Sequence, residues 1–295
     1  MSVTVQSFFH APTNTWSHVV RDPGSRAAAI IDPVLDFDPA SGRIGSDQAR
    51  LLLDHVRTLG LNVHWILETH AHADHLSSAD WLKREIVRSQ PGAAPKVGIG
   101  RGITAVQRHF RRVFGLGDGF AADGHDFDRL LDDGDRLPLG ALEIQAIATP
   151  GHTSDGMSYV ISDAVFVGDT LFAPQAGTGR CDFPGADAAT QYRSIQRLYA
   201  LPDETRVFLC HDYPPAGTPP TAETTVGAEK AANIQLRGDT SEADYVAFRR
   251  TRDATLAVPR LLYPSLQVNI RAGRLPDADA NGLVFLRMPL QVDAD

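Results

Sequence analysis

Short apolar runs, broken by proline, glycine and asparagine, open the chain and predict a meander of β-strands. These strands are expected at residues 3–9, 16–20 and 27–31. The pattern then changes to a helical period over residues 44–59. Its apolar positions predict one buried helix face, formed by Leu51, Leu52, Val56 and Leu59.

Strands and helices alternate through the rest of the chain, as they do in an α/β domain. Further strands are expected at residues 62–67, 96–99, 142–149, 157–162, 164–168 and 206–210. Further helices are expected at residues 78–88, 103–114 and 187–200, with a long loop over residues 115–134. Beyond a proline-rich stretch, the pattern is mostly helical at residues 223–236, 242–255 and 261–268. We therefore expect one domain over residues 1–215 and a helical extension, residues 216–295, that packs on it.

Composition narrows the class of protein. The 295 residues are 43% hydrophobic and 22% charged, which is typical of a globular chain. The net charge of −8 disfavours nucleic acid and anionic membranes as partners. Two cysteines form no disulfide framework, and no secretory signal or transmembrane segment is evident. A cytoplasmic location is expected.

Polar residues cluster where the expected strands end. One strand runs directly into the segment His70–His75, and three other strands are followed by His152, Asp169 and His211. Functional side chains collected from several strand ends are the usual way in which an α/β scaffold builds a site. The pattern therefore predicts an active site at one edge of the fold.

The residue types in this cluster predict a metal centre. Imidazole binds zinc, copper, iron and nickel, and a carboxylate in the set favours a harder ion such as iron or manganese. His70 and His72 alternate beyond a strand, so both can face one ion. Asp74 and His75 continue the turn and can reach a neighbouring position.

The chain resembles the metallo-β-lactamase superfamily. The likeness lies in Thr69-His70-x-His72-x-Asp74-His75, Pro150-Gly151-His152-Thr153, Gly168-Asp169-Thr170 and His211-Asp212. It implies an αββα sandwich, here with a helical C-terminal extension. In dinuclear members, one ion would be held by His70, His72 and His152. The other would be held by Asp74, His75 and His211, with Asp169 bridging the two ions.

Within the superfamily, the closer likeness is to the persulfide dioxygenases. The likeness includes Glu68–Leu76, Gly168–Phe172, Gly179–Phe183, His211–Tyr213 and Leu266–Gly273. It implies one Fe(II) per chain, held by His70, His152 and Asp169, and oxidation of glutathione persulfide by O2 and water to sulfite and glutathione. The other four candidates would then orient these ligands or bind a second metal: His72, Asp74, His75 and His211. Cys181, where many relatives carry threonine, is a departure from the family pattern.

Glutathione carries two carboxylates, and arginine suits their bidentate recognition. The candidate substrate-binding residues are Arg180, Arg271 and Lys230. Tyr213 is a candidate hydrogen-bond donor to the persulfide or to oxygen. Cys181 is interpreted as a small packing residue.

Two other functions remain open. A dinuclear zinc hydrolase of glutathione thioesters, resembling glyoxalase II, would use the same ligands for two Zn ions, with hydroxide attacking the carbonyl. A sensor that binds reactive sulfur without turnover is a third reading. A homodimer is compatible with the sequence, which does not fix the oligomeric state.

Overall fold

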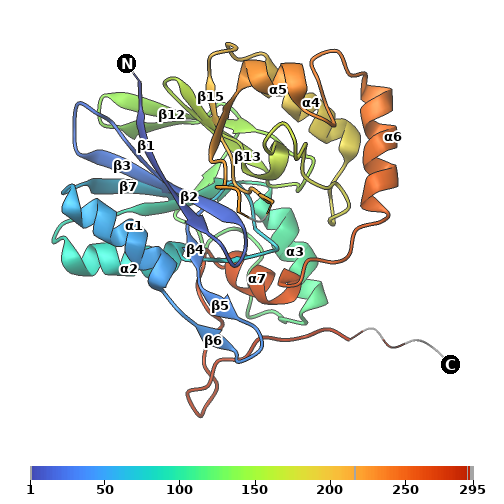
Figure 1. Ribbon diagram of the computed structural model, residues 1–295. Helices are drawn as coiled ribbons and strands as arrows, with labels where there is room; N and C mark the ends of the chain where they lie inside the picture. Colours follow the sequence, from blue (N-terminus) through green and yellow to red (C-terminus); the bar gives the residue numbers. More distant parts are fainter. Residues whose placement is uncertain (1, 216, 291, 293–295) are drawn as a thin grey trace.

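Two β-sheets lie face to face between layers of helices in the computed structural model, which describes residues 2–215, 217–290 and 292 (Figure 1). In the described chain each of these sheets has six strands, and two short two-stranded pairs accompany them. The short pairs are β4 (Val34–Leu35) with β8 (Leu76–Ser77) and β5 (Phe37–Asp38) with β6 (Arg43–Ile44). This is the expected αββα sandwich.

The first sheet holds the opening meander and the first crossover strands. In spatial order its strands are β1 (Thr4–His10), β2 (Thr15–Arg21), β3 (Ala27–Ile31), β7 (Asn62–Leu67), β9 (Lys96–Gly100) and β10 (Arg129–Leu131). Neighbouring strands from β3 to β10 run parallel. The helices of its outer layer are α1 (Asp47–Thr58), α2 (Ala79–Ser89) and α3 (Ile103–Val113). They bury one apolar cluster against the sheet, which includes Leu52, Ile66 and Phe110.

The second sheet carries the later motifs. Its strands, in spatial order, are β11 (Arg136–Leu139), β12 (Leu142–Ala148), β13 (Met157–Ile161), β14 (Ala164–Phe166), β15 (Arg206–Phe208) and β16 (Glu223–Thr225). The remaining helical segments are η1 (Gly168–Thr170), α4 (Ala188–Tyr199), α5 (Val226–Ala232), α6 (Glu242–Asp253) and α7 (Leu262–Asn269). Ile195 of α4 and Tyr245 of α6 pack in one cluster with Val165 and Val207 of this sheet. In Figure 1, α4, α5 and α6 lie on the opposite side of the sheets from α1 and α2.

A third apolar cluster fills the space between the sheets. Ile31 and Leu67 of the first sheet meet Ile144, Tyr159 and Phe166 of the second, and all five side chains are buried. Alternating strand positions thus serve the two faces of each sheet, one toward this core and one toward the helices. This packing brings the ends of strands from both sheets to one edge.

The buried face of α1 differs from the prediction. Leu52 and Val56 are buried, but Leu51 and Leu59 are 55% and 44% exposed, and Leu53 is buried in their place. Positions 52, 53 and 56 share one face at the i, i+1, i+4 spacing of an α-helix, whereas Leu51 projects from another side. Leu59 follows the helix, which ends at Thr58.

The C-terminal segment also contains a strand that the sequence did not predict. The expected helix over residues 223–236 is a strand, β16, followed by α5. Its two consecutive threonines suit an extended backbone, and the side chain of Thr225 caps α5 by accepting a hydrogen bond from the Ala228 N–H at 3.1 Å. β16 pairs with β15, so residues beyond 215 complete the second sheet. The expected domain division at residue 215 stays a prediction. The loop expected over residues 115–134 likewise contains a strand, β10.

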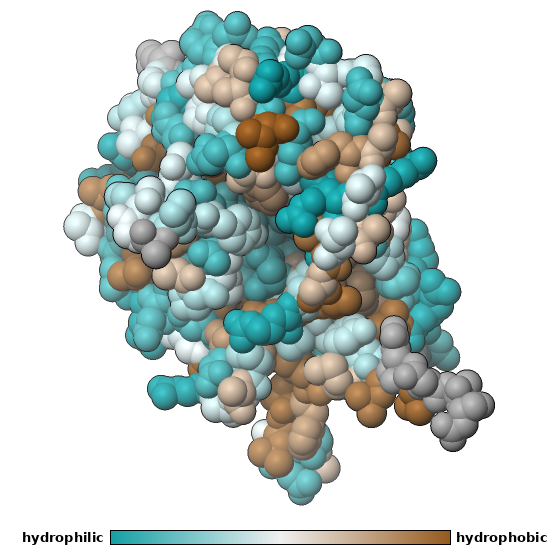
Figure 2. Space-filling model, turned by 45° about the vertical axis from the view of Figure 1, so that its right-hand side comes forward, coloured by the Kyte–Doolittle hydropathy of each residue, from teal (hydrophilic) through white to brown (hydrophobic). Residues whose placement is uncertain are grey.

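The described chain approaches its C-terminus as irregular structure with several exposed apolar side chains. These are Leu283, Val284, Phe285, Met288, Leu290 and Val292. Figure 2 shows apolar residues gathered at the lower edge of the molecule. None of the helices in the described ranges is long and apolar enough to cross a membrane.

Candidate metal centre

Each candidate metal ligand follows the end of a strand. The loop that carries His70 and His75 begins where β7 ends, and His152 follows β12. Asp169 lies in the short helical turn η1 after β14, and His211 lies just beyond β15. The two sheets therefore deliver all of the expected ligands to one edge of the sandwich, as predicted.

The first group of potential ligand atoms comes from His70, His152 and Asp169. One atom from each of these side chains lies within 4.8 Å of the others. The Nδ1–H of His152 donates to the backbone oxygen of Arg180 at 2.7 Å. Because a carbonyl can only accept, this bond leaves Nε2 of His152 free to bind a metal, and Nε2 lies 3.5 Å from the Asp169 carboxylate.

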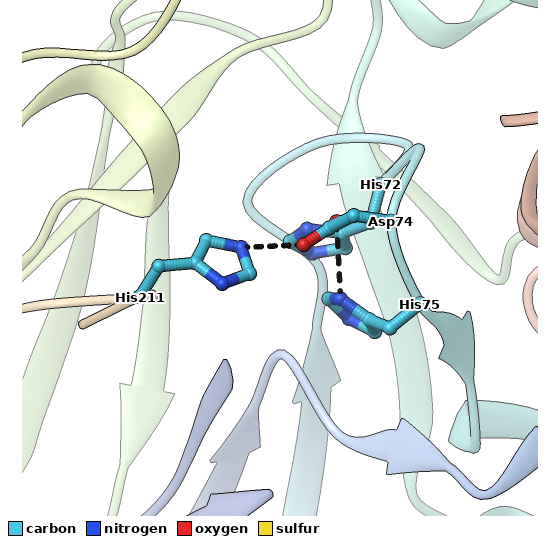
Figure 3. A group of neighbouring side chains, drawn as sticks. All are labelled: His72, Asp74, His75 and His211. Atoms are coloured by element: carbon cyan, nitrogen blue, oxygen red, sulfur yellow. Dashed lines mark ion pairs between the residues drawn. The ribbon is translucent and has the colours of Figure 1, made fainter. Parts of the chain in front are cut away.

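A second group consists of His72, Asp74, His75 and His211, whose potential ligand atoms also lie within 4.8 Å of one another. Figure 3 shows the Asp74 carboxylate between two imidazoles, 3.3 Å from Nδ1 of His75 and 3.2 Å from Nε2 of His211. Nε2 of His211 is also 3.3 Å from Asp169, which connects the two groups. His70 and His72, expected to face one ion, fall into different groups, although their rings are only 4.0 Å apart.

Asp32, which follows β3, forms hydrogen bonds with the loop that carries His70 and His75. Its carboxylate accepts hydrogen bonds from the Thr69 N–H at 2.7 Å, from the Thr69 hydroxyl at 2.9 Å and from Nε2 of His72 at 3.0 Å. The bond to His72 leaves Nδ1 of that ring as its free nitrogen. Asp32 was not among the residues predicted from the sequence, although a lone carboxylate directly after the apolar strand 27–31 is a usable signal.

The donor atoms fit a metal ion. Two buried side-chain atoms at the centre, Nδ1 of His72 and Nε2 of His75, have no hydrogen-bond partner within the described ranges. Nε2 of His211 and Oδ1 of Asp169 also form no hydrogen bond there, although they lie 3.3 Å apart as an ion pair. Leaving buried polar atoms unpaired is costly, and native proteins rarely do so without a ligand or water. Imidazole nitrogens and carboxylate oxygens in this arrangement are the donors that zinc and iron bind.

The histidines of the centre differ in the direction in which their surroundings shift the pKa. Burial, helped by the neighbouring imidazoles, holds the pKa of His70 well below its usual value, and burial lowers the pKa of His75 to about 4. Both rings are therefore neutral, the form that binds metal. Burial also opposes the charged form of His72 and His211, but nearby carboxylates outweigh it and raise the pKa of both rings well above the usual value. Asp32 does so for His72, and Asp74 and Asp169 do so for His211.

A cavity of about 410 Å³ opens beside this centre. His152, Asp169 and Asp74 lie in its wall, and Tyr213 lies at 56% exposure with its ring stacked on His211. The remaining lining residues are mostly apolar or cationic: Ala73, Phe172, Ala176, Thr178, Arg180, Phe183, Gln235, Arg249, Arg252, Leu256 and Pro259. The centre therefore faces a pocket of a size and character suited to a small anionic molecule.

Arg180 alone of the three predicted substrate-binding cations lies in this pocket. Its guanidinium is already paired with Asp182 through Nε at 2.5 Å and Nη2 at 2.6 Å. Lys230 lies elsewhere, where it pairs with Asp203 at 2.6 Å. Arg271 stacks over Phe120 and lines a separate cavity. Arg271 lies in the motif Leu266–Gly273, but its side chain lines this other cavity rather than the pocket beside the metal centre.

Two cations of α6 line the pocket and were missed. Arg249 is buried and donates to Asp253, while Arg252 is exposed and donates to the Thr255 hydroxyl at 3.2 Å. They are three residues apart, so they share a helix face, but the sequence does not say what that face contacts.

The surroundings of Cys181 disfavour the thiolate form. Its sulfur lies 2.6 Å from Oε1 of Gln191, and burial raises the pKa of the thiol. The uncharged thiol is thus favoured, which agrees with the interpretation of Cys181 as a packing residue.

Comparisons with known proteins agree with this geometry. A "Probable metallo-hydrolase" of Burkholderia pseudomallei is 48% identical to the chain, covering 98% of it and 99% of the relative. "Glyoxylase B2" of Dictyostelium discoideum is 39% identical, covering 97% and 96% respectively. The mitochondrial persulfide dioxygenase ETHE1 of Homo sapiens is 27% identical, covering 72% and 69%.

A solved structure and a family profile complete the comparison. ETHE1 from Myxococcus xanthus superposes with a TM-score of 0.71 at 28% identity, covering 92% of this chain and 100% of that one. The profile of the metallo-beta-lactamase superfamily matches residues 10–211, which include every ligand of both groups. Sequence, fold and donor set therefore agree: the chain belongs to the metallo-beta-lactamase superfamily.

Proposed function

We propose that the protein is an iron-dependent persulfide dioxygenase that oxidises glutathione persulfide with O2 and water to sulfite and glutathione. The observation that carries this proposal is the group His70, His152 and Asp169. Two histidines and one carboxylate are the face on which mononuclear iron oxygenases bind Fe(II) while leaving positions open. His152 and Asp169 line the cavity, so an ion held by this group would lie beside the pocket that we assign to the substrate.

The bound Fe(II) would supply the redox chemistry that allows dioxygen to react with sulfur. The chain's own residues bind and orient the substrate. Phe172 and Phe183 form apolar parts of the pocket wall and would exclude water, and Tyr213, which also lines the pocket, would donate a hydrogen bond from its hydroxyl. The similarity to persulfide dioxygenases in sequence and structure supports the same assignment.

Arg252 is the cation that we assign to a substrate carboxylate. Among the described cations that line the pocket, Arg180 and Arg249 are each paired with an aspartate, whereas Arg252 has no carboxylate partner. A guanidinium without an internal carboxylate partner can form an ion pair with a carboxylate of glutathione without breaking another ion pair. Arg252 therefore replaces Arg271 and Lys230 as the substrate-binding candidate.

A dinuclear zinc hydrolase of glutathione thioesters is the second candidate. The observation that favours it is the second donor group, His72, Asp74, His75 and His211, which offers a complete ligand set for another ion. The relatives at 48% and 39% identity carry hydrolase and glyoxylase names. Two metal ions would generate and hold the hydroxide that attacks a thioester carbonyl.

The deciding experiment measures dioxygen uptake with glutathione persulfide on protein whose iron and zinc are counted in the same sample. The dioxygenase predicts uptake and sulfite formation that scale with about one iron per chain. No uptake by fully iron-loaded protein, together with hydrolysis of S-lactoylglutathione by a two-zinc form, would establish the hydrolase. Tight persulfide binding without turnover under air would instead identify a sensor.

A further inference from the structure

We propose that Asn269, the last residue of α7, is a positioning residue of the metal centre. It belongs to the C-terminal segment 266–273, far in sequence from the ligands, and has no contact with the pocket. Its role is to fix the backbone of the loop that carries His72 and His75, so that their imidazoles are held where a metal can bind them.

The Asn269 side chain is fully engaged with this loop. Its amide nitrogen donates to the backbone oxygens of His72 at 2.7 Å and His75 at 2.8 Å. Its amide oxygen accepts from the Ser77 N–H at 2.8 Å. The residue is 4% exposed, so water does not compete for these bonds. One side chain thus forms hydrogen bonds with three backbone groups of the loop, spread over the six residues 72–77.

The loop needs such support because it has little regular structure of its own. β7 ends at Leu67, and the next strand, β8, begins at Leu76. Between them, Asp32 holds the Thr69 N–H and Asp155 holds the Ala71 N–H at 2.8 Å. Asn269 forms hydrogen bonds with the rest of the loop, from His72 to Ser77. The side chains of Asp32, Asp155 and Asn269 therefore supply backbone hydrogen bonds that a neighbouring strand would provide in a sheet.

α7 is itself a rigid base for Asn269. Leu266 and Ile270 are buried in the cluster that fills the space beneath α1, α2 and α3. The Ile270 carbonyl accepts a hydrogen bond from Gln107 of α3 at 2.8 Å. Gly273 has a φ of +81°, and a Cβ there would lie 2.8 Å from the Ser77 backbone oxygen, so the end of α7 packs directly on the loop. The side-chain amide of Asn269 is therefore held in place by the apolar cluster around α7 and by the packing of Gly273 on the loop.

Loss of the amide would leave the carbonyls of His72 and His75 buried and unpaired. Buried unpaired carbonyls are unfavourable, so the loop would shift to pair them with water, and both imidazoles would move with it. Removing a group that orients metal ligands typically weakens metal affinity about 10- to 100-fold. His72 and His75 belong to the second donor group, so this loss is expected for an ion held by that group, whichever reaction the protein catalyses.

The test compares Asn269→Ala with Gln267→Ala on the same helix. Gln267 is 2% exposed and equally engaged, but it bonds Tyr263 and Arg287 rather than the metal loop. We expect N269A to weaken Zn²⁺ affinity, measured by competition with a chromogenic chelator, about 10- to 100-fold. Q267A should bind Zn²⁺ with an affinity within about twofold of the wild type, while losing thermal stability.

A second readout is independent of metal. Hydrogen exchange on metal-free protein should quicken over residues 70–77 in N269A but not in Q267A. If N269A does not fold, Asn269→Asp retains the size and the acceptor for Ser77, loses the donor to both carbonyls, and should reproduce the affinity loss. Wild-type affinity in a folded Asn269 variant, or an equal loss in Q267A, would overturn the proposal. The Zn²⁺ affinities and the exchange rates of these variants can be interpreted whether or not the dioxygenase assay detects activity.

Discussion

Asp32 and Thr69 lie at the ends of neighbouring parallel strands, and the Asp32 carboxylate accepts both the backbone N–H and the hydroxyl of Thr69. The same carboxylate accepts Nε2 of His72, so one buried group fixes the start of the metal loop and the orientation of a ligand. Asp32 has a φ of +48°, a conformation that aspartate and asparagine tolerate better than most residues. The hydrogen bonds of Asp32 thereby connect the end of β3 to the metal centre.

Replacing Asp32 with alanine should weaken both folding and metal binding. Buried donors of Thr69 and His72 lose their acceptor, which is expected to cost about 2–4 kcal/mol of unfolding free energy. Metal affinity should fall about 10- to 100-fold because His72 is no longer oriented. Chemical denaturation and chelator competition measure the two effects. Asp22→Ala is the control, since Asp22 is also buried and bonds Gly24, Ser25 and Ala141 away from the site. An equal affinity loss in that control would count against the role of Asp32.

Gly168→Ala should be strongly destabilising. Gly168 has a φ of +53°, and a Cβ there would lie 2.5 Å from the Thr69 hydroxyl oxygen. Backbone strain and this collision together should cost about 2–4 kcal/mol in a denaturant titration. Gly134 shares a positive φ, +84°, but has nothing within 4 Å of its Cβ position. Gly134→Ala should therefore cost only the backbone strain, about 1 kcal/mol. Equal losses would show that the packing against Thr69 is not tight.

Arg252→Ala should raise the KM for glutathione persulfide and leave kcat nearly unchanged. An ion pair at an exposed position contributes about 1 kcal/mol, which corresponds to a three- to tenfold rise in KM. Arg250→Ala is the matched control, because Arg250 is also exposed on α6 but lines a different cavity, beside Cys181. Steady-state kinetics at two ionic strengths would check the assignment. An unchanged KM in R252A would remove Arg252 from the substrate site.

Glu229 should make stability depend on pH. Its carboxyl group is fully buried, and burial raises its pKa from 4.5 to about 7. The folded state therefore holds this proton more tightly than the unfolded state, and stability contributed by the protonated form is lost as the pH rises from about 4.5 to about 7. The loss should approach about 3 kcal/mol, at about 1.4 kcal/mol for each pH unit of pKa shift.

Glu229→Gln remains neutral and provides the comparison for this pH dependence. The unfolding free energy of the wild type, measured between pH 5 and pH 8, should fall relative to that of E229Q as the pH rises. Parallel curves for the two proteins would mean that Glu229 titrates as it does in the unfolded chain.

The strand ends that bring the candidate ligands together could be predicted from local patterns, and the αββα sandwich from the resemblance to the metallo-β-lactamase superfamily. A run of apolar residues that ends in a histidine or aspartate marks a strand end, and four such ends converge in the fold. Side chains that act across the fold could not be identified in this way. Asp32, Arg252 and Asn269 reach their partners only after distant elements pack, and the sequence around each gives no sign of the partner.

The expectations that the structure does not follow have a common physical origin. Arg271 lies two residues from Asn269, in the turn after α7, and its side chain stacks on Phe120 in another cavity. Leu51 was assigned to the buried face of α1, where a shift of one residue separates core from solvent. Periodicity identifies an element well, but the side chain that an element presents to a site depends on its rotation.

β16 has a practical consequence for any shortened form of the protein. The family profile ends at residue 211, but the strand that covers β15 comes from Glu223–Thr225. A polypeptide cut at the profile boundary would keep all the metal ligands of both groups and expose the unpaired backbone of β15. Open strand edges template aggregation, so a shortened form that keeps β15 paired must extend past His211, the last candidate ligand, to include β16.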